Sequence, residues 1–533
     1  MQVPMTPNRI LKRAVKLYPN KVAVIDGSVR FTYSQVRQRV TQLANATFDL
    51  KLSPGARVAV LDYNTHRYME LYYAMAQSGR VLLPLNILIS PDDYSYILND
   101  AEVEALIFHA DFKPKVDQFR KTLKTKISFF VADGPADEDW ITGTYEDLVA
   151  NSSTEGKWCD PDDENDLLNL YYTSGTTGRP KGVMLTHRNI YVNALATIIT
   201  FTLKDSTVFM HVAPLFHIAD AFFIWAVTYQ GGAHVMMRQF RPKAVLQTMQ
   251  DEKITDTLMV PTMISCILEM GNFDLFDLTA LEKIMVGGAS MSPANAKRMK
   301  KKFGCEYVPG YGLTETCPLL AAGNLKETLS DQPEDIKIDH ITRTGLEVVG
   351  VDLRVVNKNG GDVPWDGMSV GEIIVRGDNV MKGYWNLPDE TAKVMKNGYF
   401  YTGDLANVDS EGYIFIVDRA KDIIIRSGEN IASVEIENFL YAHPAVLDCA
   451  VIAFPDKRWG EVPKALVTLK QEATVTEKEL VSYCRKGLAR FKVPKYIVFI
   501  DEMPKTGSGK IMKIELRKRY GSPIGEINGK IRL

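Results

Sequence analysis

The 533-residue sequence predicts an α/β protein with two unequal domains. Three observations lead to this fold class. From about residue 20, short apolar runs alternate with amphipathic ones, which is the pattern of βαβ units and parallel sheets. The chain is too long for one compact core of the usual size. The pattern also changes near Asp418, so we expect a large N-terminal domain of βα-layered sheets over 1–418 and a smaller α+β domain over 419–533.

The first strand–helix–strand unit is predicted between residues 57 and 85. Arg57 to Leu61 and Val81 to Leu85 are apolar like buried strands, and Arg67 to Gln77, which Gly79 ends, has a helical pattern. Ser90–Asp93 begins the next helix with an N-cap, a proline and early acids. Further strands, each followed by a turn signal and a helical pattern, are predicted at Thr207–Ala213, Asp256–Val260 and Leu281–Val286, and Ser292-Pro293 repeats the cap-and-proline start.

After about residue 340 the chain becomes richer in strand patterns. Glu347–Val356 and Gly371–Arg376 predict a small β-rich section with Gly360-Gly361 as a turn. Beyond Asp418, strands are predicted at Ile423–Ile425, Cys449–Ala453, Ala465–Leu469 and Tyr496–Ile500, and helices at Ser433–Tyr441 and Glu477–Leu488. Roughly 115 residues are enough for a separate α+β domain.

Composition excludes several function classes. Lys and Arg number 63 against 65 Asp and Glu, so no global field attracts nucleic acid or an anionic membrane. The six cysteines lack metal-type spacing, and we expect reduced thiols. The N-terminus lacks the apolar core of a signal peptide, and Ala221 to Val227 is too short to span a bilayer. We expect a soluble, cytoplasmic protein without a transmembrane segment; peripheral membrane contact and a homodimer stay open.

The segment from Tyr171 to Gly182 is a candidate phosphate-binding loop. Its glycines can turn backbone N–H groups inward as an anion nest, while its hydroxyl side chains and one lysine add donors and charge. It departs from the Walker pattern, because Pro180 stands where the second glycine would be. The candidate residues are Thr173, Ser174, Gly175, Thr176, Thr177, Gly178 and Lys181.

Two later segments carry further nucleotide-type chemistry. In Gly310–Thr316, glycines flank Tyr311, whose ring offers a stacking face, and Glu315 offers oxygen to Mg²⁺. Downstream, Asp404 and Arg419 form a carboxylate-and-arginine set that suits a ribose. If these segments stood alone, Tyr311 would more often be a structural tyrosine, and Glu315, Asp404 and Arg419 would more often be surface charges.

The ordered set of motifs resembles the adenylate-forming enzymes, a superfamily of acyl-CoA synthetases, peptide-synthetase adenylation domains and beetle luciferases. Residues 171–182 resemble its AMP-binding signature, and 310–316 match its second motif without a departure. The resemblance covers roughly Phe31 to Lys513. It implies that Tyr311 stacks on the adenine, Thr314 contacts the α-phosphate and Glu315 binds Mg²⁺. It further implies that Asp404 and Arg419 bind the ribose. The glycine segment with Gly288 and Ala289, beside Gly312, would line the adenine and acyl pockets.

The same resemblance assigns roles in the C-terminal region. Lys510, in a glycine-rich loop, matches the catalytic lysine of the family, and Lys421 lies where relatives pivot a mobile small domain. Gly428 lies where relatives admit the pantetheine thiol of CoA. His217 is the most open case, since a histidine beside apolar residues is about as often a packed core residue; with the resemblance we favour a gate next to the carboxylate.

These expectations define an ATP-dependent, AMP-forming acyl-CoA synthetase that uses ATP, Mg²⁺ and coenzyme A. We expect an apolar carboxylic acid (medium-chain, alicyclic or aryl), as in fatty or aromatic acid metabolism. The residues expected to line its pocket are Phe216, Ile218, Phe222, Phe223, Cys317, Pro318 and Leu319. Asp220 could face away or recognise an amine.

Three alternatives stay open. A stand-alone adenylation enzyme would load a carrier protein, which would have to act in trans because only 23 residues follow Lys510. A luciferase-like oxidation is weaker, since the scaffold does not indicate oxygen chemistry. A non-catalytic nucleotide sensor is the third, although Lys181, Glu315 and Lys510 are all retained. Neither the acid nor the physiological direction of the reaction follows from the sequence.

Overall fold

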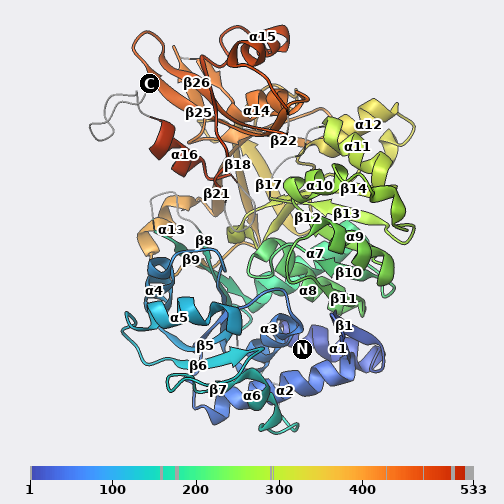
Figure 1. Ribbon diagram of the computed structural model, residues 1–533, viewed down its shortest axis with the longest axis vertical. Coiled ribbons are helices and arrows are strands. Elements are labelled where there is room, and N and C mark those ends of the chain that lie inside the picture. Colours follow the sequence, from blue (N-terminus) through green and yellow to red (C-terminus); the bar gives the residue numbers. More distant parts are fainter. Residues whose placement is uncertain are drawn as a thin grey trace.

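The computed structural model describes residues 3–156, 160–161, 163–173, 179–288, 291, 293–427, 429–471, 473–505 and 511–521 (Figure 1). It confirms the predicted α/β class. Two large, mostly parallel sheets form the body of the molecule, and two smaller, mostly antiparallel sheets follow in the chain. In Figure 1 the C-terminal region lies at one end of the long axis, beyond the strands β17, β18 and β21.

The larger of the two body sheets has nine strands. In spatial order they are β16 (Leu346–Glu347), β15 (Leu319–Ala322), β14 (Glu306–Gly312), β13 (Lys283–Val286), β12 (Asp256–Met259), β10 (Val208–His211), β11 (Ala233–Met236), β1 (Val22–Asp26) and β2 (Val29–Thr32). The strands from β14 to β1 are parallel, and antiparallel strands close both edges.

The second body sheet has eight strands. Their order is β19 (Gly383–Tyr384), β9 (Lys181–Thr186), β8 (Leu167–Thr173), β4 (Val81–Pro84), β3 (Arg57–Leu61), β5 (Val103–His109), β6 (Ser128–Ala132) and β7 (Gly143–Thr144). The predicted unit at 57–85 is confirmed as β3, α3 (His66–Ser78) and β4. Gly79 ends α3 with a φ of 65°, which glycine adopts without strain.

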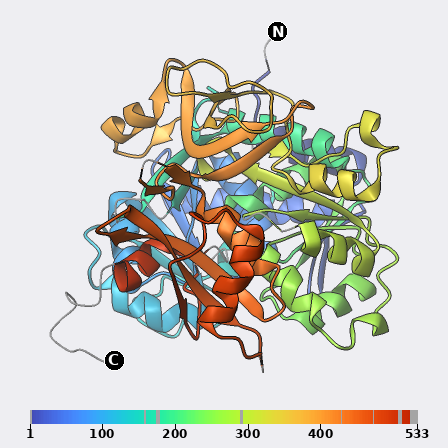
Figure 2. The ribbon, with the colours of Figure 1, turned by 90° about the horizontal axis from the view of Figure 1, so that it is seen from above.

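Helices cover the faces of both body sheets (Figures 1 and 2). Those not yet named in the N-terminal 400 residues are α1 (Pro7–Leu17), α2 (Tyr33–Asp49), α4 (Pro91–Asp100), α5 (Lys113–Arg120), α6 (Tyr145–Ala150), α7 (His187–Phe201), α8 (Ile218–Gln230), α9 (Pro242–Asp251), α10 (Pro261–Leu268), α11 (Pro293–Phe303), α12 (Glu334–Thr342) and α13 (Pro388–Val394). Capping boxes at Thr32, Ser90 and Thr186 begin α2, α4 and α7. Ser292, the predicted cap of α11, lies outside the described residues.

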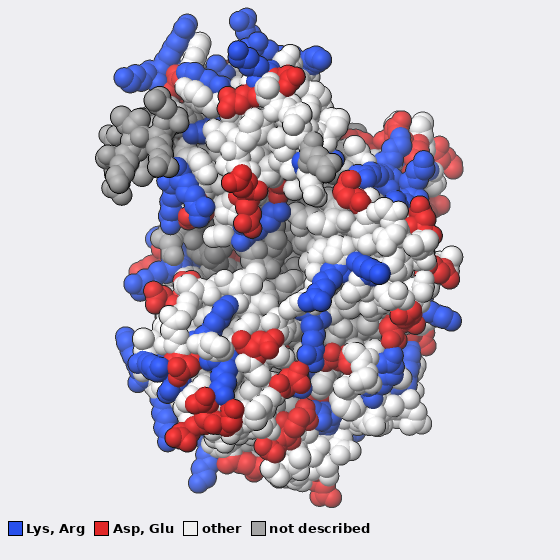
Figure 3. Space-filling view, viewed as in Figure 1, with Lys and Arg blue, Asp and Glu red and all other residues white. Residues whose placement is uncertain are grey.

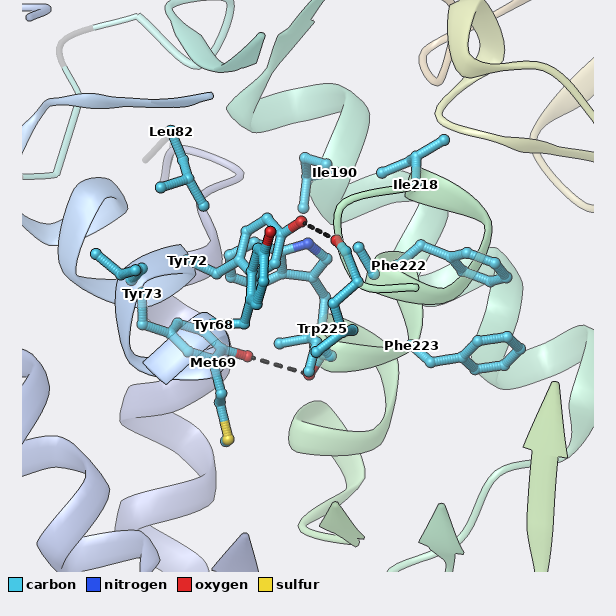
Figure 4. Packing of buried hydrophobic residues seen from close by; sticks show 14 of the residues in the cluster. Tyr68, Met69, Tyr72, Tyr73, Leu82, Ile190, Ile218, Phe222, Phe223 and Trp225 are labelled. Atoms are coloured by element: carbon cyan, nitrogen blue, oxygen red, sulfur yellow. Dashed lines mark hydrogen bonds between the residues drawn. The ribbon is translucent and has the colours of Figure 1, made fainter. Parts of the chain in front are cut away.

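The main apolar core lies where helices from both body sheets meet. Figure 4 shows Tyr72 and Tyr73 of α3 facing Trp225 of α8, with ring centroids 5.4 and 4.6 Å from the indole. Both tyrosine pairs are edge-to-face, the arrangement that aromatic quadrupoles favour. This packing joins the two sheets into one body.

A central five-stranded sheet follows, with strands β17 (Val351–Val356), β18 (Gly371–Gly377), β21 (Tyr399–Val408), β20 (Met395–Lys396) and β22 (Ile414–Arg419). One predicted strand, Glu347–Val356, is wrong in its extent. The structure divides it into β16 and β17, which belong to different sheets, because Gly350 turns the chain with a φ of 85°.

The C-terminal region forms its own five-stranded sheet of β24 (Glu429–Ile431), β23 (Ile424–Arg426), β26 (Gly460–Leu469), β25 (Val446–Asp456) and β27 (Tyr496–Phe499). Helices α14 (Ser433–Tyr441), α15 (Glu477–Gly487) and α16 (Lys513–Tyr520) pack against it, with separate apolar clusters around Ile436 and Leu516. The chain passes from the central sheet to this sheet between Arg419 and Ile424. We propose that 419–533 is the small domain.

On the face seen in Figure 3, acidic and basic side chains are interspersed, which matches the near balance of charges in the sequence. The cysteines at 266, 305, 317, 449 and 484 are free thiols. Within the described part of the chain, no helix is long and apolar enough to cross a bilayer.

Candidate active site

Two of the sequence motifs meet at the carboxyl ends of β13 and β14. These strands are parallel neighbours, with Val286 in register with Pro309. Gly287 and Gly288 follow β13, and Gly288 has a φ of 84°, a conformation suited to glycine. The glycine floor therefore lies beside Tyr311 and Gly312 at the end of β14, where open α/β sheets bind ligands. Ala289 lies outside the described residues.

The structure brings together a tyrosine, a carboxylate and an arginine that the sequence predicts to bind adenosine. The Tyr311 hydroxyl donates to Asp404 Oδ2 at 2.8 Å, and Arg419 Nε lies 3.1 Å from Asp404 Oδ1. Asp404 and Arg419 are register partners across β21 and β22, so the sheet itself places them together. Burial, and then the charge of Asp404, raise the pKa of Tyr311 well above its ordinary value, which keeps the phenol protonated.

Gly312 is required by the protein's own backbone. A Cβ at this position would lie 1.6 Å from the carbonyl oxygen of Pro318. The sequence suggested that glycines beside Tyr311 let a ligand approach. For Gly312 the close neighbour is instead the backbone of Pro318, just before β15. This approach fixes the turn that carries Thr314 and Glu315.

Lys181, which is predicted to bind phosphate, has an acidic partner in the structure. Its Nζ is 2.7 Å from Glu390 Oε2 of α13 and 5.1 Å from the centre of the Tyr384 ring. Hydrogen bonds from Lys181 and Lys393 lower the pKa of Glu390 to about 2. Thr173 is the register partner of Lys181 across β8 and β9, whereas Ser174, Gly175, Thr176, Thr177 and Gly178 lie outside the described residues.

Tyr384 connects Lys181 to Glu315. Its hydroxyl donates to Glu315 Oε1 at 2.9 Å while its ring lies under the Lys181 ammonium. Burial and the charge of Glu315 raise the pKa of Tyr384 above its ordinary value. Glu315 lies in the 3₁₀ turn Thr314–Thr316, and its carbonyl accepts from the Met381 backbone N–H at 2.8 Å.

Glu315 fits a Mg²⁺ ion that is held mainly by the nucleotide. Among the described residues, no group of three His, Cys, Asp or Glu side chains could hold a metal. Mg²⁺ in nucleotide enzymes usually takes one or two carboxylates, with phosphates and waters completing the shell. A single half-buried carboxylate oriented by Tyr384 matches that donor set.

His217 caps helix α8. Its Nδ1 accepts from the Ala219 backbone N–H at 3.1 Å, and the side chain is half-buried. The capping contact fixes the imidazole at the start of the helix that also carries Ile218, Phe222 and Phe223. The gate role of His217 stays a prediction.

The residues predicted to line the acyl pocket belong, apart from Pro318, to the main apolar core. Figure 4 shows Phe222 and Phe223 extending together from α8, with ring centroids 4.2 Å apart. Phe223 also stacks on Phe209 at 4.3 Å, so it supports the core.

Asp220 is fully buried and faces a chain of polar side chains. Its Oδ2 is 3.0 Å from His211 Nδ1; His211 Nε2 is 2.9 Å from His234 Nδ1, and His234 Nε2 is 2.9 Å from Thr228 Oγ1. Burial raises the pKa of Asp220 and lowers that of His211 to about 3. Of the two possibilities for Asp220, facing away or recognising an amine, its burial against His211 favours the first.

Lys421 lies in the connection between the two small sheets. Burial lowers its pKa, and the like charge of Arg419 adds to that effect, while Asp422 opposes it. Lys421 is two residues after Arg419, so it lies near the Asp404–Arg419 pair. Gly428 and Lys510 lie outside the described residues.

Comparison with known proteins identifies the family. Residues 11–385 match the AMP-binding enzyme family, and residues 435–510 match the AMP-binding enzyme C-terminal domain. The chain belongs to the AMP-binding enzyme family. The first match covers the body sheets and Tyr384, and the second covers α14, α15 and Lys510.

Relatives of this AMP-binding enzyme match over nearly their whole length. Feruloyl-CoA synthase of Amycolatopsis sp is 36% identical over 96% of this chain and 98% of its own. Peroxisomal benzoate–CoA ligase of Arabidopsis thaliana is 33% identical over 97% and 93%. The chain is an AMP-forming acid–thiol ligase.

Solved structures of the same fold include nucleotide-bound ones. Anthranilate CoA ligase AuaEII in complex with anthranoyl-AMP has a TM-score of 0.88 and 25% identity, covering 97% of this chain and 98% of that one. ATP-bound MatB from Rhodopseudomonas palustris has a TM-score of 0.85 and 27% identity, covering 97% and 99%.

Sequence reasoning missed Tyr384 and Glu390 of this AMP-binding enzyme. Lys181 and Glu390 are 209 positions apart, and only the antiparallel pairing of β19 with β9 brings them together. Tyr384 lies on a short strand and Glu390 on a surface helix. Neither belongs to a sequence motif that would have identified it.

Proposed function

We propose that this AMP-binding enzyme is an ATP-dependent aryl-acid–CoA ligase. The observation that carries the proposal is the pair of polar contacts around Tyr311 and Tyr384: Tyr311 with Asp404 and Arg419 suits a ribose, and Tyr384 with Glu315 and Lys181 suits Mg²⁺ and phosphates. Relatives that act on benzoate, trans-cinnamate and ferulate support an aryl acid within the apolar class.

In the first half-reaction the substrate carboxylate attacks the α-phosphorus of ATP, and pyrophosphate leaves. Tyr311 would stack on the adenine, while Asp404 and Arg419 would bind the ribose hydroxyls. Lys181 would exchange Glu390 for phosphate oxygens, with Thr314 near the α-phosphate. Mg²⁺, held by Glu315, would neutralise charge on the phosphates. Lys510 would stabilise the charge that develops between carboxylate and phosphate.

In the second half-reaction the CoA thiol attacks the acyl carbon, and AMP leaves. Carboxylate oxygen is a poor leaving group and AMP is a good one, so two easier substitutions replace a hard one. The small domain would rotate about Lys421 between the steps, and Gly428 would border the path of the thiol.

The burial of Asp220 against His211 supports an apolar acyl group. Asp220 is fully buried, and its Oδ2 is bonded to His211 in the apolar core. The predicted pocket residues contain no lysine or arginine that could pair with a second carboxylate, and burying such a charge unpaired is costly. Benzoate- and cinnamate-type acids satisfy both conditions.

Pyrophosphate exchange across aryl, alicyclic, aliphatic and amino-acid carboxylates, with and without CoA, tests the proposal. We expect the fastest exchange with aryl acids and conversion of the adenylate to a thioester when CoA is added. Comparable exchange with amino acids or dicarboxylates would contradict the acyl class. Transfer to a carrier protein without transfer to CoA would favour the adenylation alternative.

Two lysine variants test the two-step reaction. Lys510→Ala should lower adenylation by about 10²–10³-fold, the scale of losing one preorganised stabiliser, while thioester formation from added acyl-adenylate continues. Lys421→Pro restricts the backbone of the proposed pivot and should preserve exchange while thioester output falls. Lys478→Ala, at an exposed lysine of α15, is the matched control and should change neither rate. Loss of the same half-reaction in both test variants would contradict the rotation.

A further inference from the structure

The helix that follows the Lys510 loop is tied to the start of α14. Lys513, the first residue of α16, donates from Nζ to Ser433 Oγ at 2.6 Å and pairs with Glu437 Oε1 at 2.7 Å. Leu516, on the same helix, is fully buried against the C-terminal sheet. The side chains of Lys513 and Glu437 are only 16% and 13% exposed, so little solvent screens this pair.

Ser433 in turn bonds to the central sheet. Its backbone N–H and its hydroxyl both donate to Asp418 Oδ2, the hydroxyl at 2.6 Å. Asp418 is 2% exposed and lies on β22, opposite Leu405 and next to the Asp404–Arg419 pair. The carboxylate therefore connects the predicted ribose end to the C-terminal region.

Asp418 also replaces a missing helix cap. The N-cap residue of α14, Ala432, has no side chain that could bond to the first turn. A carboxylate at a helix N-terminus satisfies a free backbone N–H and is favoured by the helix dipole. The start of α14 thus depends on a side chain from another sheet.

A second tie lies one helical turn along α16. Arg517, four residues after Lys513, forms an ion pair with Asp422. Residues four apart lie on one helix face, so one face of α16 contacts both sides of Lys421: directly at Asp422, and through Ser433 at Asp418.

Rotation about Lys421 would separate these partners. Asp418 would stay with Asp404 on the central sheet, whereas Ser433 and Lys513 would move with the C-terminal sheet. The movement would break bonds from two donors to a buried carboxylate and leave α14 uncapped. Arg517 and Asp422 lie beyond the pivot and could stay together.

We propose that Asp418, Ser433 and Lys513 form a latch that holds the small domain in the orientation of this structure and sets the balance between the two half-reactions. The proposal rests on the two-step reaction proposed above. The three side chains are positioning residues. They act through the orientation of the small domain.

Ser433→Ala is the most discriminating variant. It removes the hydroxyl link between Asp418 and Lys513 but keeps the backbone N–H that caps α14. We expect the ratio of pyrophosphate exchange to thioester formation from added acyl-adenylate to change by about tenfold, the scale of one charge-assisted hydrogen bond. Ser433→Thr, which keeps the hydroxyl, should restore the wild-type ratio, and Asp418→Asn should shift it in the same direction as Ser433→Ala.

Thr476→Ala is the matched control. Thr476 caps α15 within the same C-terminal region through a hydroxyl that bonds to Glu479 and does not touch the latch. Its removal should lower the melting temperature about as much as Ser433→Ala does while leaving the ratio unchanged. Equal loss of both half-reactions in Ser433→Ala would show a merely structural role and overturn the latch.

Inter-domain distance provides a readout that does not need turnover. Spin-label amino acids at Leu275 and Leu447, which are 80% and 50% exposed, would report the orientation of the two parts by pulsed dipolar spectroscopy. We expect Ser433→Ala to add a second distance population, and a distribution identical to wild type would overturn the latch. If the wild-type protein exchanges pyrophosphate but forms no thioester, the proposed CoA ligase is contradicted. The distance measurement would still test the latch, because it does not depend on turnover.

Discussion

The two ends of the predicted nucleotide site hold their charges differently. At the ribose end, Asp404 and Arg419 are register partners on adjacent strands, and Asp404 is buried. At the phosphate end, Lys181 pairs with an acid from a short surface helix, 209 residues away. A ribose can add hydrogen bonds to a pair that the sheet already places, whereas phosphates must displace Glu390 from Lys181. The ribose end is thus preorganised and the phosphate end is exchangeable.

The largest effect should come from breaking the preorganised end. Asp404→Ala removes the acceptor for the ribose hydroxyls and for Tyr311, and leaves Arg419 without its acid. We expect AMP, ATP and acyl-adenylate to bind about 10²–10³-fold more weakly, since each charge-assisted bond contributes ~1.5–3 kcal/mol. Calorimetry with AMP measures this. Tyr311→Phe, which loses only the phenol bond, should cost much less, and equal losses in the two variants would contradict the ribose assignment.

The carboxylate of Glu315, which we propose binds Mg²⁺, should give the next largest effect. Glu315→Gln keeps the shape but removes the charge that Mg²⁺ requires, so adenylation should fall by about 10²-fold while binding of preformed acyl-adenylate changes little. Tyr384→Phe removes only the orienting hydroxyl and should lower adenylation by about tenfold. Magnesium titrations of pyrophosphate exchange separate the two variants. Parallel losses of adenylation and of adenylate binding would indicate a structural role for Glu315.

The exchangeable end should give the smallest effect and in the opposite direction. Glu390→Gln frees Lys181 for phosphate, and we expect ATP to bind about two- to fivefold more tightly, the scale of an exposed ion pair. The gain should shrink at high salt. Weaker ATP binding would mean that Glu390 positions Lys181 and does not compete for it.

The same pair predicts a pH dependence of stability. Because the pKa of Glu390 falls from 4.5 to about 2 on folding, the ionised carboxylate stabilises the folded state. That contribution is complete above about pH 4.5 and disappears as the pH falls toward 2. The difference in melting temperature between wild type and Glu390→Gln should follow this course, and a constant difference would contradict it.

Local patterns predicted the elements of the fold better than their partners. The strand Arg57–Leu61 and the helix Ser433–Tyr441 appear with the bounds predicted, because apolar composition and backbone propensity act over a few residues. The strand predicted at Glu347–Val356 was too long, since Gly350 sends the chain from one sheet to another. Pattern alone does not reveal which sheet a short apolar run will join.

The sequence by itself determined the fold class, the order of the motifs and the family, because each motif is a short run whose chemistry depends on its own residues. Only the tertiary structure decided which charges meet. Tyr384 and Glu390 beside Lys181, His211 beside Asp220, and Ser433 beside Asp418 all depend on pairings between elements that are distant in the chain. Such pairings follow from sheet order and helix packing, which no local pattern specifies.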